Sequence, residues 1–340
     1  MDNKKEGKLL EVKDLKVSFF TPAGEVKAVG GISYELNYGE VMGIVGESGS
    51  GKSVEAYSIM GLLQSPGKVI GGSITFEGED VLAKSKEEMT DFRGKKVSMI
   101  FQNPMTCLNP VYTVGNQLVE ALRAHNKDIS VSDAKKRAME MLELVGINNV
   151  EKRMKQYPHE FSGGMRQRVM IAMGLICHPQ LLIADEPTTA LDVTIQAQIL
   201  ELMKELQKKT HMGIIFITHN LGVVAEICDK VSVMYAGKIV EQGKVNDIFY
   251  SPSHPYTNGL LRSMPRVDAE EYERLIPIDG TPVDMLNPPE GCPFAPRCEH
   301  CMQICLRKMP PYFELGDGHR SACWLLAKQK SESKEAESNG

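Results

Sequence analysis

The sequence predicts an α/β fold with a mostly parallel β-sheet, and three observations lead to this prediction. Residues 46–53 fit the template G-x-x-x-x-G-K-[ST] at every fixed position, and such a loop joins a strand to a helix. Continuous apolar strands are expected at residues 41–45, 181–184 and 214–217, and they alternate with helical patterns. A helical block at about residues 114–170 is inserted into this core.

The glycine-rich loop is expected to bind a nucleotide triphosphate. The strand at residues 41–45 leads into it, and residues 54–63 have the apolar spacing of the helix that leaves it. Glycines let backbone N–H groups converge on phosphates, and the helix directs its positive end at the same anion. Lys52 would reach the β- and γ-phosphates, and Ser53 would bind Mg²⁺. The loop residues predicted to contact the nucleotide are Gly46, Ser48, Gly49, Ser50, Gly51, Lys52 and Ser53.

The composition is that of a globular protein with a large domain and an extension. The chain has 340 residues, of which 42% are hydrophobic and 24% are charged. The net charge of −5 gives no electrostatic basis for binding nucleic acid. No apolar run is long enough to span a bilayer, and the first residues lack the apolar segment of a signal peptide. We therefore expect a cytoplasmic protein that reaches a membrane only through a protein partner.

Helix and turn signals place further elements along the chain. Ser132 is predicted to cap a helix that runs to about Val145, and Gly146 is predicted to stop it. A long amphipathic helix is expected over Asp192 to Thr210. Residues 231–242 have the pattern of a hairpin.

Two acidic residues follow the buried strand at residues 181–184. A carboxylate at the C-terminal end of such a strand, beside a phosphate loop, is the position of a Mg²⁺ ligand, and here it is Asp185. Glu186 is then placed to orient and polarise the attacking water. Adjacent acids can also form a solvated turn, but the apolar strand before them and Pro187 after them favour a site.

A second glycine-rich helix start lies at Ser162, Gly163 and Gly164. The backbone N–H groups at such a helix start can bind an anion. An ordinary serine N-cap explains the same residues equally well when they are considered alone.

These motifs occur in an order that resembles the ATP-binding subunits of ABC transporters, over residues ~8 to ~250. The resemblance implies a P-loop NTPase fold of the ABC type with a helical subdomain. Gln102 is similar to the family's glutamine that contacts Mg²⁺ and water and links to the membrane subunits. His219 is similar to the histidine that contacts the γ-phosphate, although a histidine after a strand is locally ordinary.

The resemblance also implies a dimer with ATP between two chains arranged head to tail. The Ser162–Gly164 signature of one chain then serves the nucleotide of the other, and hydrolysis reopens the dimer. Asp192 is similar to the family's D-loop aspartate and is also a suitable helix N-cap. Phe19 occupies the position of the aromatic that stacks on adenine; Phe20 is a competing candidate, and a strand-core role is the alternative.

Segments outside the shared core resemble the oligopeptide and dipeptide importers. Residues 102–110 are similar to their extended Q-loop, residues 253–257 to the start of their C-terminal extension, and residues 292–323 to its end. Peptide is the expected cargo, with nickel or another small solute as the alternative. Residues 48–54 resemble the D-type subunit, which pairs with a different second ATPase chain.

The resemblance therefore implies a set of partners. They are a second nucleotide-binding subunit, two transmembrane permease subunits and an extracytoplasmic peptide-binding protein. The chain would lie at the cytoplasmic face of the cell membrane.

Five of the eight cysteines lie in the last fifth of the chain. Cys292, Cys298, Cys305 and Cys323 match the family's pattern, and Cys301 is an additional thiol. Four thiolates suffice for a [4Fe–4S] cluster or a Zn²⁺ ion, and their spacing does not choose between them. Reduced structural cysteines are the alternative. A bound cluster would stabilise a proline-rich module with little core of its own.

We therefore expect a nucleotide-binding domain at residues 1–250, an importer extension at 251–328 and a disordered tail at 329–340. The expected activity is ATP hydrolysis coupled to peptide transport. Two other classes of function are a soluble ABC ATPase, which would favour tandem cassettes or a long coiled-coil insertion, and a metal-cluster redox module.

Overall fold

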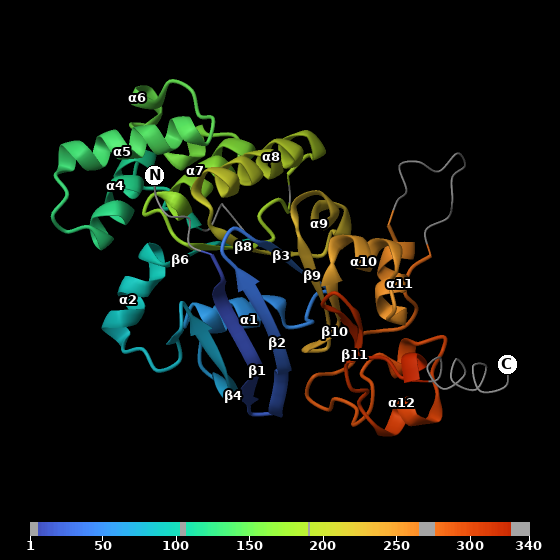
Figure 1. Cartoon of the computed structure of the whole chain (residues 1–340). Helices are drawn as coiled ribbons and strands as arrows, with labels where there is room; N and C mark the ends of the chain where they lie inside the picture. Colours follow the sequence, from blue (N-terminus) through green and yellow to red (C-terminus); the bar gives the residue numbers. More distant parts are fainter. Residues whose placement is uncertain (1–5, 103–106, 190, 265–275, 328–340) are drawn as a thin grey trace, which may run out of the picture. The chain divides into compact units, whose positions relative to one another are not determined.

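The computed structural model describes residues 6–102, 107–189, 191–264 and 276–327, which form two compact units. Unit 1 comprises the described residues of Met1–Leu10, Glu35–Val41 and Thr75–Ile217. Unit 2 comprises those of Glu11–Tyr34, Met42–Ile74 and Thr218–Gly340. Each unit combines β-strands with helices, which confirms the predicted α/β class (Figure 1).

Unit 1 contains three parallel strands in the order β8-β7-β6. Their bounds are Val97–Ile100 for β6, Leu181–Asp185 for β7 and Gly213–Thr218 for β8. Every residue of β7 and β8 is buried, as expected for parallel strands that are covered on both faces. The short strand β5, Glu79–Asp80, pairs with the end of β4.

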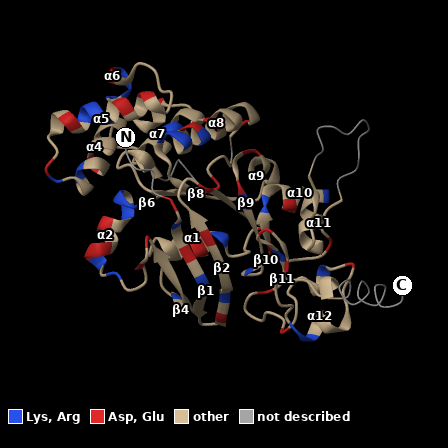
Figure 2. Cartoon of the chain, in the orientation of Figure 1, with Lys and Arg blue, Asp and Glu red and all other residues tan. Residues whose placement is uncertain are grey.

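The helices of unit 1 pack on one another and on this sheet. Helix α7 contacts β6, α4 and α5, and Figure 1 shows α4 to α8 gathered in one region. The helices from α4 to α7 occupy the stretch, about residues 114–170, for which a helical block was predicted, and α8 corresponds to the helix predicted over Asp192 to Thr210. The helices are α2 (Lys86–Lys95), α4 (Val114–His125), α5 (Val131–Leu144), α6 (Val150–Arg153), η1 (Pro158–Glu160), α7 (Gly163–Leu175) and α8 (Val193–Thr210). Acidic and basic residues are interspersed along α2 and α5 (Figure 2).

The predicted cap of α5 is wrong by two residues. Ser130, and not Ser132, is the N-cap, because its side-chain oxygen accepts a hydrogen bond from the Asp133 N–H at 3.0 Å. The predicted stop is confirmed, since Gly146 follows the helix with a φ of +76°.

One group of strands in unit 2 follows the order β11-β12-β10-β9-β3. Strands β3 and β9 are parallel, whereas β9, β10, β12 and β11 pair antiparallel. Their bounds are Val41–Val45 (β3), Lys230–Tyr235 (β9), Lys238–Lys244 (β10), Phe313–Gly316 (β11) and His319–Ser321 (β12). The predicted hairpin is confirmed as β9–β10. Its turn residues Ala236 and Gly237 have φ angles of +47° and +72°, as in a type I′ turn.

A second group of strands in unit 2 follows the order β2-β1-β4. Strand β1 spans Lys8–Thr21, β2 spans Gly24–Asn37 and β4 spans Gly67–Phe76. The helices of unit 2 are α1 (Lys52–Ile59), α9 (Leu221–Ile227), α10 (Val245–Tyr250), α11 (Pro255–Arg262), η2 (Ala295–Arg297) and α12 (Gln303–Arg307). Helix α1 is shorter than predicted, because the chain leaves the helix at Met60 and Gly61 has a φ of +58°.

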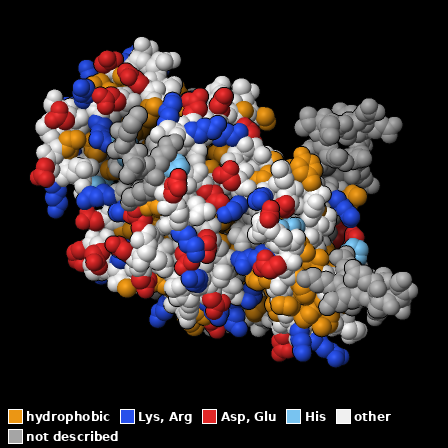
Figure 3. Space-filling model, in the orientation of Figure 1, with side chains coloured by type: hydrophobic (Ala, Val, Ile, Leu, Met, Phe, Trp, Pro, Cys, Tyr) orange, Lys and Arg blue, Asp and Glu red, His pale blue; other side chains and the backbone are white. Residues whose placement is uncertain are grey.

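The C-terminal segment of unit 2, residues 276–327, shares the core of that unit. Strands β11 and β12 extend the sheet from β10, and Phe294 packs among Tyr235 and Tyr256 with ring centroids 5.3 Å from each. This shared core agrees with the expectation of a module with little core of its own, because its apolar residues pack against the rest of unit 2. Apolar side chains also gather on its surface (Figure 3), where Ile304 and Leu306 are exposed.

The predicted division at residues 250 and 251 stays a prediction. The predicted tail at residues 329–340 lies outside the described residues. Within the part of the chain that the structure describes, no helix has the length and apolar character needed to cross a bilayer.

Candidate functional site

The glycine-rich loop of unit 2 has the backbone geometry of a phosphate cradle. It connects the fully buried strand β3 to helix α1. Gly51 has a φ of +98°, and a Cβ there would lie 2.4 Å from the carbonyl oxygen of Ala28. A Cβ on Gly46 would lie 2.1 Å from the carbonyl oxygen of Met234. Only glycine fits both positions, so the sequence template corresponds to a real steric requirement.

The lysine of this loop lies across it and is largely buried. Lys52 is 6% exposed, and its Nζ donates to the carbonyl oxygens of Gly46 at 2.8 Å and Glu47 at 2.9 Å. The Ser50 hydroxyl lies 3.4 Å from the same ammonium group. A buried cation held at the mouth of a loop of N–H groups provides charge for a phosphate.

Helix α1 begins at this loop in a way that suits an anion. Its N-cap is Gly51, which has no side chain to cap the first turn. The first N–H groups of a helix have no partner within the helix, and the helix dipole adds positive potential there. Ser53, the second residue of α1, follows Lys52 directly.

The two aromatic candidates for adenine lie on β1 in different surroundings. The Phe19 ring packs against Gly67, since a Cβ on Gly67 would lie 2.7 Å from the ring. Phe20 is 48% exposed. The Phe19 ring is therefore packed against the backbone at Gly67, and the Phe20 ring is the more accessible of the two for stacking on adenine.

His219 belongs to the same unit as the loop. It follows directly after β8 and is exposed. The next residue, Asn220, caps α9 through its side-chain oxygen, which accepts from the Gly222 N–H at 2.9 Å.

The predicted carboxylates lie at the C-terminal edge of the parallel strands of unit 1. Asp185 is the last residue of β7 and is 3% exposed. Glu186 follows with a φ of +47°, and its N–H donates to the Ile217 carbonyl at 2.9 Å. A left-handed conformation in a residue other than glycine marks a position that the surrounding structure enforces.

Gln102 and Glu186 are brought together although 84 residues separate them. The Gln102 Nε2 donates to the Glu186 Oε2 at 2.7 Å, and the Thr189 hydroxyl donates to the same oxygen at 3.0 Å. Both residues follow the C-terminal ends of β6 and β7, which are neighbouring parallel strands. Thr189 was not among the predicted site residues, and its position three residues after Glu186 in a turn was the available signal.

The second glycine-rich segment begins helix α7 in unit 1. Ser162 is the N-cap, its Oγ accepts from the Met165 N–H at 3.4 Å, and Ser162 and Gly163 are exposed. Apart from the adjoining residues and the backbone of α7 itself, no atom of the described residues lies within 4 Å of the position that a Cβ on Gly163 would take. This helix start is therefore open to solvent and accessible to an anion or another molecule. Asp192 caps α8 as predicted, by accepting from the Ile195 N–H at 2.9 Å.

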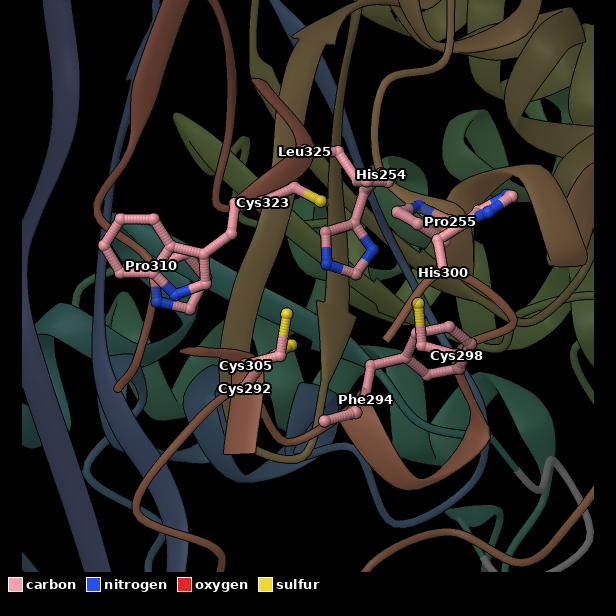
Figure 4. A pocket seen from close by; sticks show the side chains of 12 residues that line it. His254, Pro255, Cys292, Phe294, Cys298, His300, Cys305, Pro310, Cys323 and Leu325 are labelled. Carbon is pink, nitrogen blue, oxygen red and sulfur yellow. The ribbon is translucent and has the colours of Figure 1, made fainter. Parts of the chain in front are cut away.

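The four predicted cysteine ligands line one pocket in the C-terminal segment, and Cys301 does not line it. Figure 4 shows the Cys298 and Cys323 sulfurs directed into this pocket, with Cys292 and Cys305 beside them. Burial raises the pKa of Cys292 to about 12 and the pKa of Cys323 to about 11. Among the described residues, no group of three or more His, Cys, Asp or Glu side chains could hold a metal ion, so this geometry does not support the predicted metal ligands.

His254 also lines this pocket and is neutral. Burial lowers the pKa of His254 to about 3. Its Nδ1 accepts a hydrogen bond from the Tyr256 N–H at 3.1 Å, at the start of α11. The histidine therefore has a structural partner on its Nδ1 side.

Comparisons with known protein families match both parts of the chain. A family model for ABC transporters matches residues 29–189. A model for the C-terminal region of oligopeptide/dipeptide transporters matches residues 240–305.

Similar proteins align with nearly the full length of the chain. It is 58% identical over 320 residues to the oligopeptide transport ATP-binding protein OppD of Bacillus subtilis (strain 168), covering 94% of this chain and 89% of that protein. It is 57% identical over 319 residues to the dipeptide transport ATP-binding protein DppD of the same organism, covering 94% of this chain and 95% of that protein.

Solved structures of ATP-binding cassettes resemble this chain. A dimeric post-hydrolysis state of the cassette MJ0796 bound to ADP and Pi has a TM-score of 0.63 and 25% identity, and the match covers 70% of this chain and 99% of that chain. CbiO1 of Clostridium perfringens, part of the ABC transporter complex cbiONQ, has a TM-score of 0.62 and 29% identity. That match covers 72% of this chain and 91% of the CbiO1 chain.

Proposed function

Since the chain belongs to the ABC transporter family, in its group of oligopeptide and dipeptide transport ATP-binding proteins, we propose that it hydrolyses ATP to power peptide import. The observation that carries this proposal is the phosphate loop, in which Gly46 and Gly51 have no room for a Cβ and the Lys52 ammonium group is held by the carbonyl oxygen of Gly46. The cargo is a dipeptide or an oligopeptide, with nickel or another small solute as the alternative.

The loop residues bind the nucleotide in this proposal. The backbone N–H groups of Gly46, Ser48, Gly49, Ser50 and Gly51 cradle the phosphates, and Lys52 moves from the loop carbonyls to the β- and γ-phosphates. An aromatic ring on β1, Phe19 or Phe20, stacks on the adenine. Mg²⁺ neutralises charge on the phosphates when it is bound, and Ser53, Gln102 and Asp185 are its proposed ligands.

Glu186 is the proposed general base for the attacking water. Its Oε2 accepts from Gln102 at 2.7 Å and from Thr189 at 3.0 Å, which fixes the carboxylate orientation. Gln102 must release this oxygen or share it with water for the carboxylate to act. His219 is the proposed contact to the γ-phosphate.

The open start of α7 supports a dimer in which ATP lies between two chains. Ser162, Gly163 and Gly164 of one chain would bind the nucleotide held by the phosphate loop of the other. A similar cassette has been solved as a dimer with ADP and Pi. We propose that the second chain is a different nucleotide-binding subunit.

The remaining partners follow from the same function. We propose two transmembrane permease subunits and an extracytoplasmic peptide-binding protein, with this chain on the cytoplasmic face of the membrane. Residues 1–250 would form the nucleotide-binding domain, with a helical subdomain at about residues 114–170, and residues 251–328 would form the importer extension.

The test is peptide uptake by the reconstituted transporter with and without this chain. Glu186→Gln should keep ATP binding, abolish turnover and trap the closed dimer, whereas Lys52→Ala should lose ATP binding. Glu201→Gln, at an exposed position of α8, is the matched control and should hydrolyse ATP normally. Undiminished turnover in Glu186→Gln would remove Glu186 as the general base, and unchanged ATP binding in Lys52→Ala would refute the loop assignment.

A second proposal concerns the cysteine pocket, which we assign to a [4Fe–4S] cluster. The supporting observation is that four thiols from separate segments line one pocket (Figure 4). A cluster holds its ligands on four different irons, so they stand further apart than the ligands of one ion. Zn²⁺ is the alternative ion for the same four thiols. The raised thiol pKa values mean that cluster binding must release protons.

Anaerobic purification with visible spectroscopy and iron and sulfide analysis tests the cluster. Cys298→Ser should lose the iron, whereas Cys301→Ser should retain it because Cys301 does not line the pocket. A colourless, metal-free, folded and active protein would refute the cluster. A potential titration of ATPase activity would separate a redox module from a structural cluster.

A further inference from the structure

The phosphate loop is bound by the C-terminal segment through one ion pair. Glu47, the second residue of the loop, accepts from Arg297 in a bidentate arrangement, at 2.6 Å between Nη1 and Oε2 and 3.0 Å between Nη2 and Oε1. The two residues are 250 positions apart in the chain. The Arg297 side chain is 4% exposed and that of Glu47 is 28% exposed. A bidentate, largely buried guanidinium–carboxylate pair is among the stronger polar contacts in proteins.

The backbone of the same loop residue is held as well. The Glu47 N–H donates to the Tyr256 hydroxyl at 2.9 Å. The Tyr256 ring packs on Tyr235 with a centroid distance of 4.7 Å. Glu47 is therefore fixed at its side chain and at its amide by groups outside the loop.

Arg297 is itself immobilised. Its Nε donates to the Asp279 carbonyl at 2.9 Å, and its Nη2 also donates to the Ile278 carbonyl at 3.1 Å. Its Nη1 also donates to the Tyr235 hydroxyl at 3.4 Å. Because backbone carbonyls of the C-terminal segment hold the planar guanidinium group of Arg297, that segment sets the position of Glu47.

The C-terminal segment also lines the loop directly. A cavity of about 20 Å³ is bounded by the loop, at Glu47 and Ser48, and by Pro282, Val283 and Met285. The Met285 carbonyl accepts from the Lys27 N–H on β2 at 3.1 Å, which places this stretch against the sheet of unit 2. The loop is thus flanked by residues that follow it in the chain by more than 200 positions.

The position of Glu47 bears on phosphate binding. Its carbonyl oxygen is one of the two that hold the Lys52 ammonium group, and its amide is the first after Gly46. A glycine-rich loop loses much conformational freedom when its N–H groups converge on an anion. Holding one residue in place before the nucleotide arrives lowers that entropic cost.

We propose that Arg297 is a positioning residue for ATP binding, so that the C-terminal segment preorganises the phosphate loop through Glu47. The inference rests on the proposed function, because ATP is the ligand whose affinity it concerns. Breaking the pair should weaken ATP affinity by about 5- to 150-fold, the usual range for coupling between two sites.

The experiment uses the full chain in its purified transporter and compares Arg297→Gln with the wild type. We expect the KM for ATP to rise by at least about fivefold while kcat falls much less, because the general base is untouched. Arg297→Lys keeps the positive charge but cannot make the two parallel hydrogen bonds to the Glu47 carboxylate, and it should give an intermediate KM for ATP. Arg297→Gln combined with Glu47→Gln should be no worse than either single change, because both remove the same contact.

Hydrogen exchange without nucleotide separates this inference from the proposed function. Amides of residues 46–51 should exchange faster in Arg297→Gln than in the wild type, whether or not ATP is the ligand. Arg320→Gln is the matched control, because Arg320 lies in the same segment but binds Gln242 and stacks on Tyr312.

Two results would overturn the proposal. One is an unchanged KM and unchanged loop exchange in Arg297→Gln. The other is an equal rise in KM in Arg320→Gln, which would mean that any weakening of the segment suffices. If Arg297→Gln does not fold, Glu47→Gln decides alone, since it alters the more exposed partner. Failure of the wild type to bind ATP would instead refute the proposed function.

Discussion

Glu241 provides the sharpest test of how the C-terminal segment is held. This residue of β10 is completely buried. Its Oε1 accepts from the Ser253 N–H at 2.7 Å and lies 2.9 Å from the His319 Nε2. Its Oε2 accepts from the His254 N–H at 3.0 Å. One carboxylate therefore satisfies two amides before α11 and a side chain of β12.

Its replacement by glutamine or alanine should have graded costs. In Glu241→Gln the side-chain amide keeps one acceptor oxygen and places an NH₂ group where the second oxygen stood. A backbone N–H that donated to that oxygen then faces another donor and loses its hydrogen bond. That loss should lower the free energy of unfolding by about 2 kcal/mol, within a range of about 1–3. Glu241→Ala leaves every one of these donors without its acceptor and should cost about 3–5 kcal/mol.

The assay is urea unfolding followed by tryptophan fluorescence. Trp324 is the only tryptophan of the chain, and its Nε1 donates to the Lys308 carbonyl at 2.9 Å within the C-terminal segment. The signal therefore reports on the region that Glu241 holds. Glu314→Gln, on the exposed side of β11, is the control and should stay within about 0.5 kcal/mol of the wild type. If Glu241→Gln shifts stability no more than this control, the assigned hydrogen bonds do not carry the stability that we attribute to them.

Three further predictions concern local features. Gly51→Ala should abolish measurable ATP binding while leaving the fold intact by circular dichroism, because a Cβ at this φ of +98° would lie 2.4 Å from a backbone oxygen; normal binding would contradict the loop geometry. Because burial lowers the pKa of His254 to about 3 from about 6.5, the unfolded state takes up the proton first, and stability is lost as pH falls below 6.5. In urea titrations, the loss in the free energy of unfolding should reach about 2 kcal/mol by pH 5. It should be smaller in His254→Asn, whose side-chain oxygen can still accept from the Tyr256 N–H. An equal loss in that variant would exclude the histidine as its source. Ser130→Ala should lower the free energy of unfolding by about 1 kcal/mol and Ser132→Ala by much less, and the reverse order in thermal melts would restore Ser132 as the cap.

Features that depend on short stretches of chain were predictable. The phosphate loop, the helix that Asp192 caps and the hairpin at Ala236 and Gly237 each depend on the backbone preferences of a few adjacent residues. Family resemblance supplied the expected role of Gln102, the place after a buried strand supplied that of Glu186, and the structure adds the hydrogen bond that joins them.

Features that depend on a choice between near-equivalent residues were less predictable. Ser130 and Ser132 both suit a cap, and only the Asp133 N–H decides between them. Phe19 and Phe20 alternate on β1, and the backbone of Gly67 decides which ring is covered. In each case the deciding atom belongs to the surroundings of the residue and not to its own sequence pattern.

The sequence by itself determined that this chain carries a phosphate loop, a carboxylate pair after a buried strand and a set of C-terminal thiols. These follow from residue type and spacing, because glycine conformations and strand burial are short-range properties. Only the tertiary structure showed that the thiols line one pocket and that Arg297 holds Glu47. Such contacts join residues up to 250 positions apart, and they depend on the path of the chain through the sheet of unit 2, which no local pattern encodes.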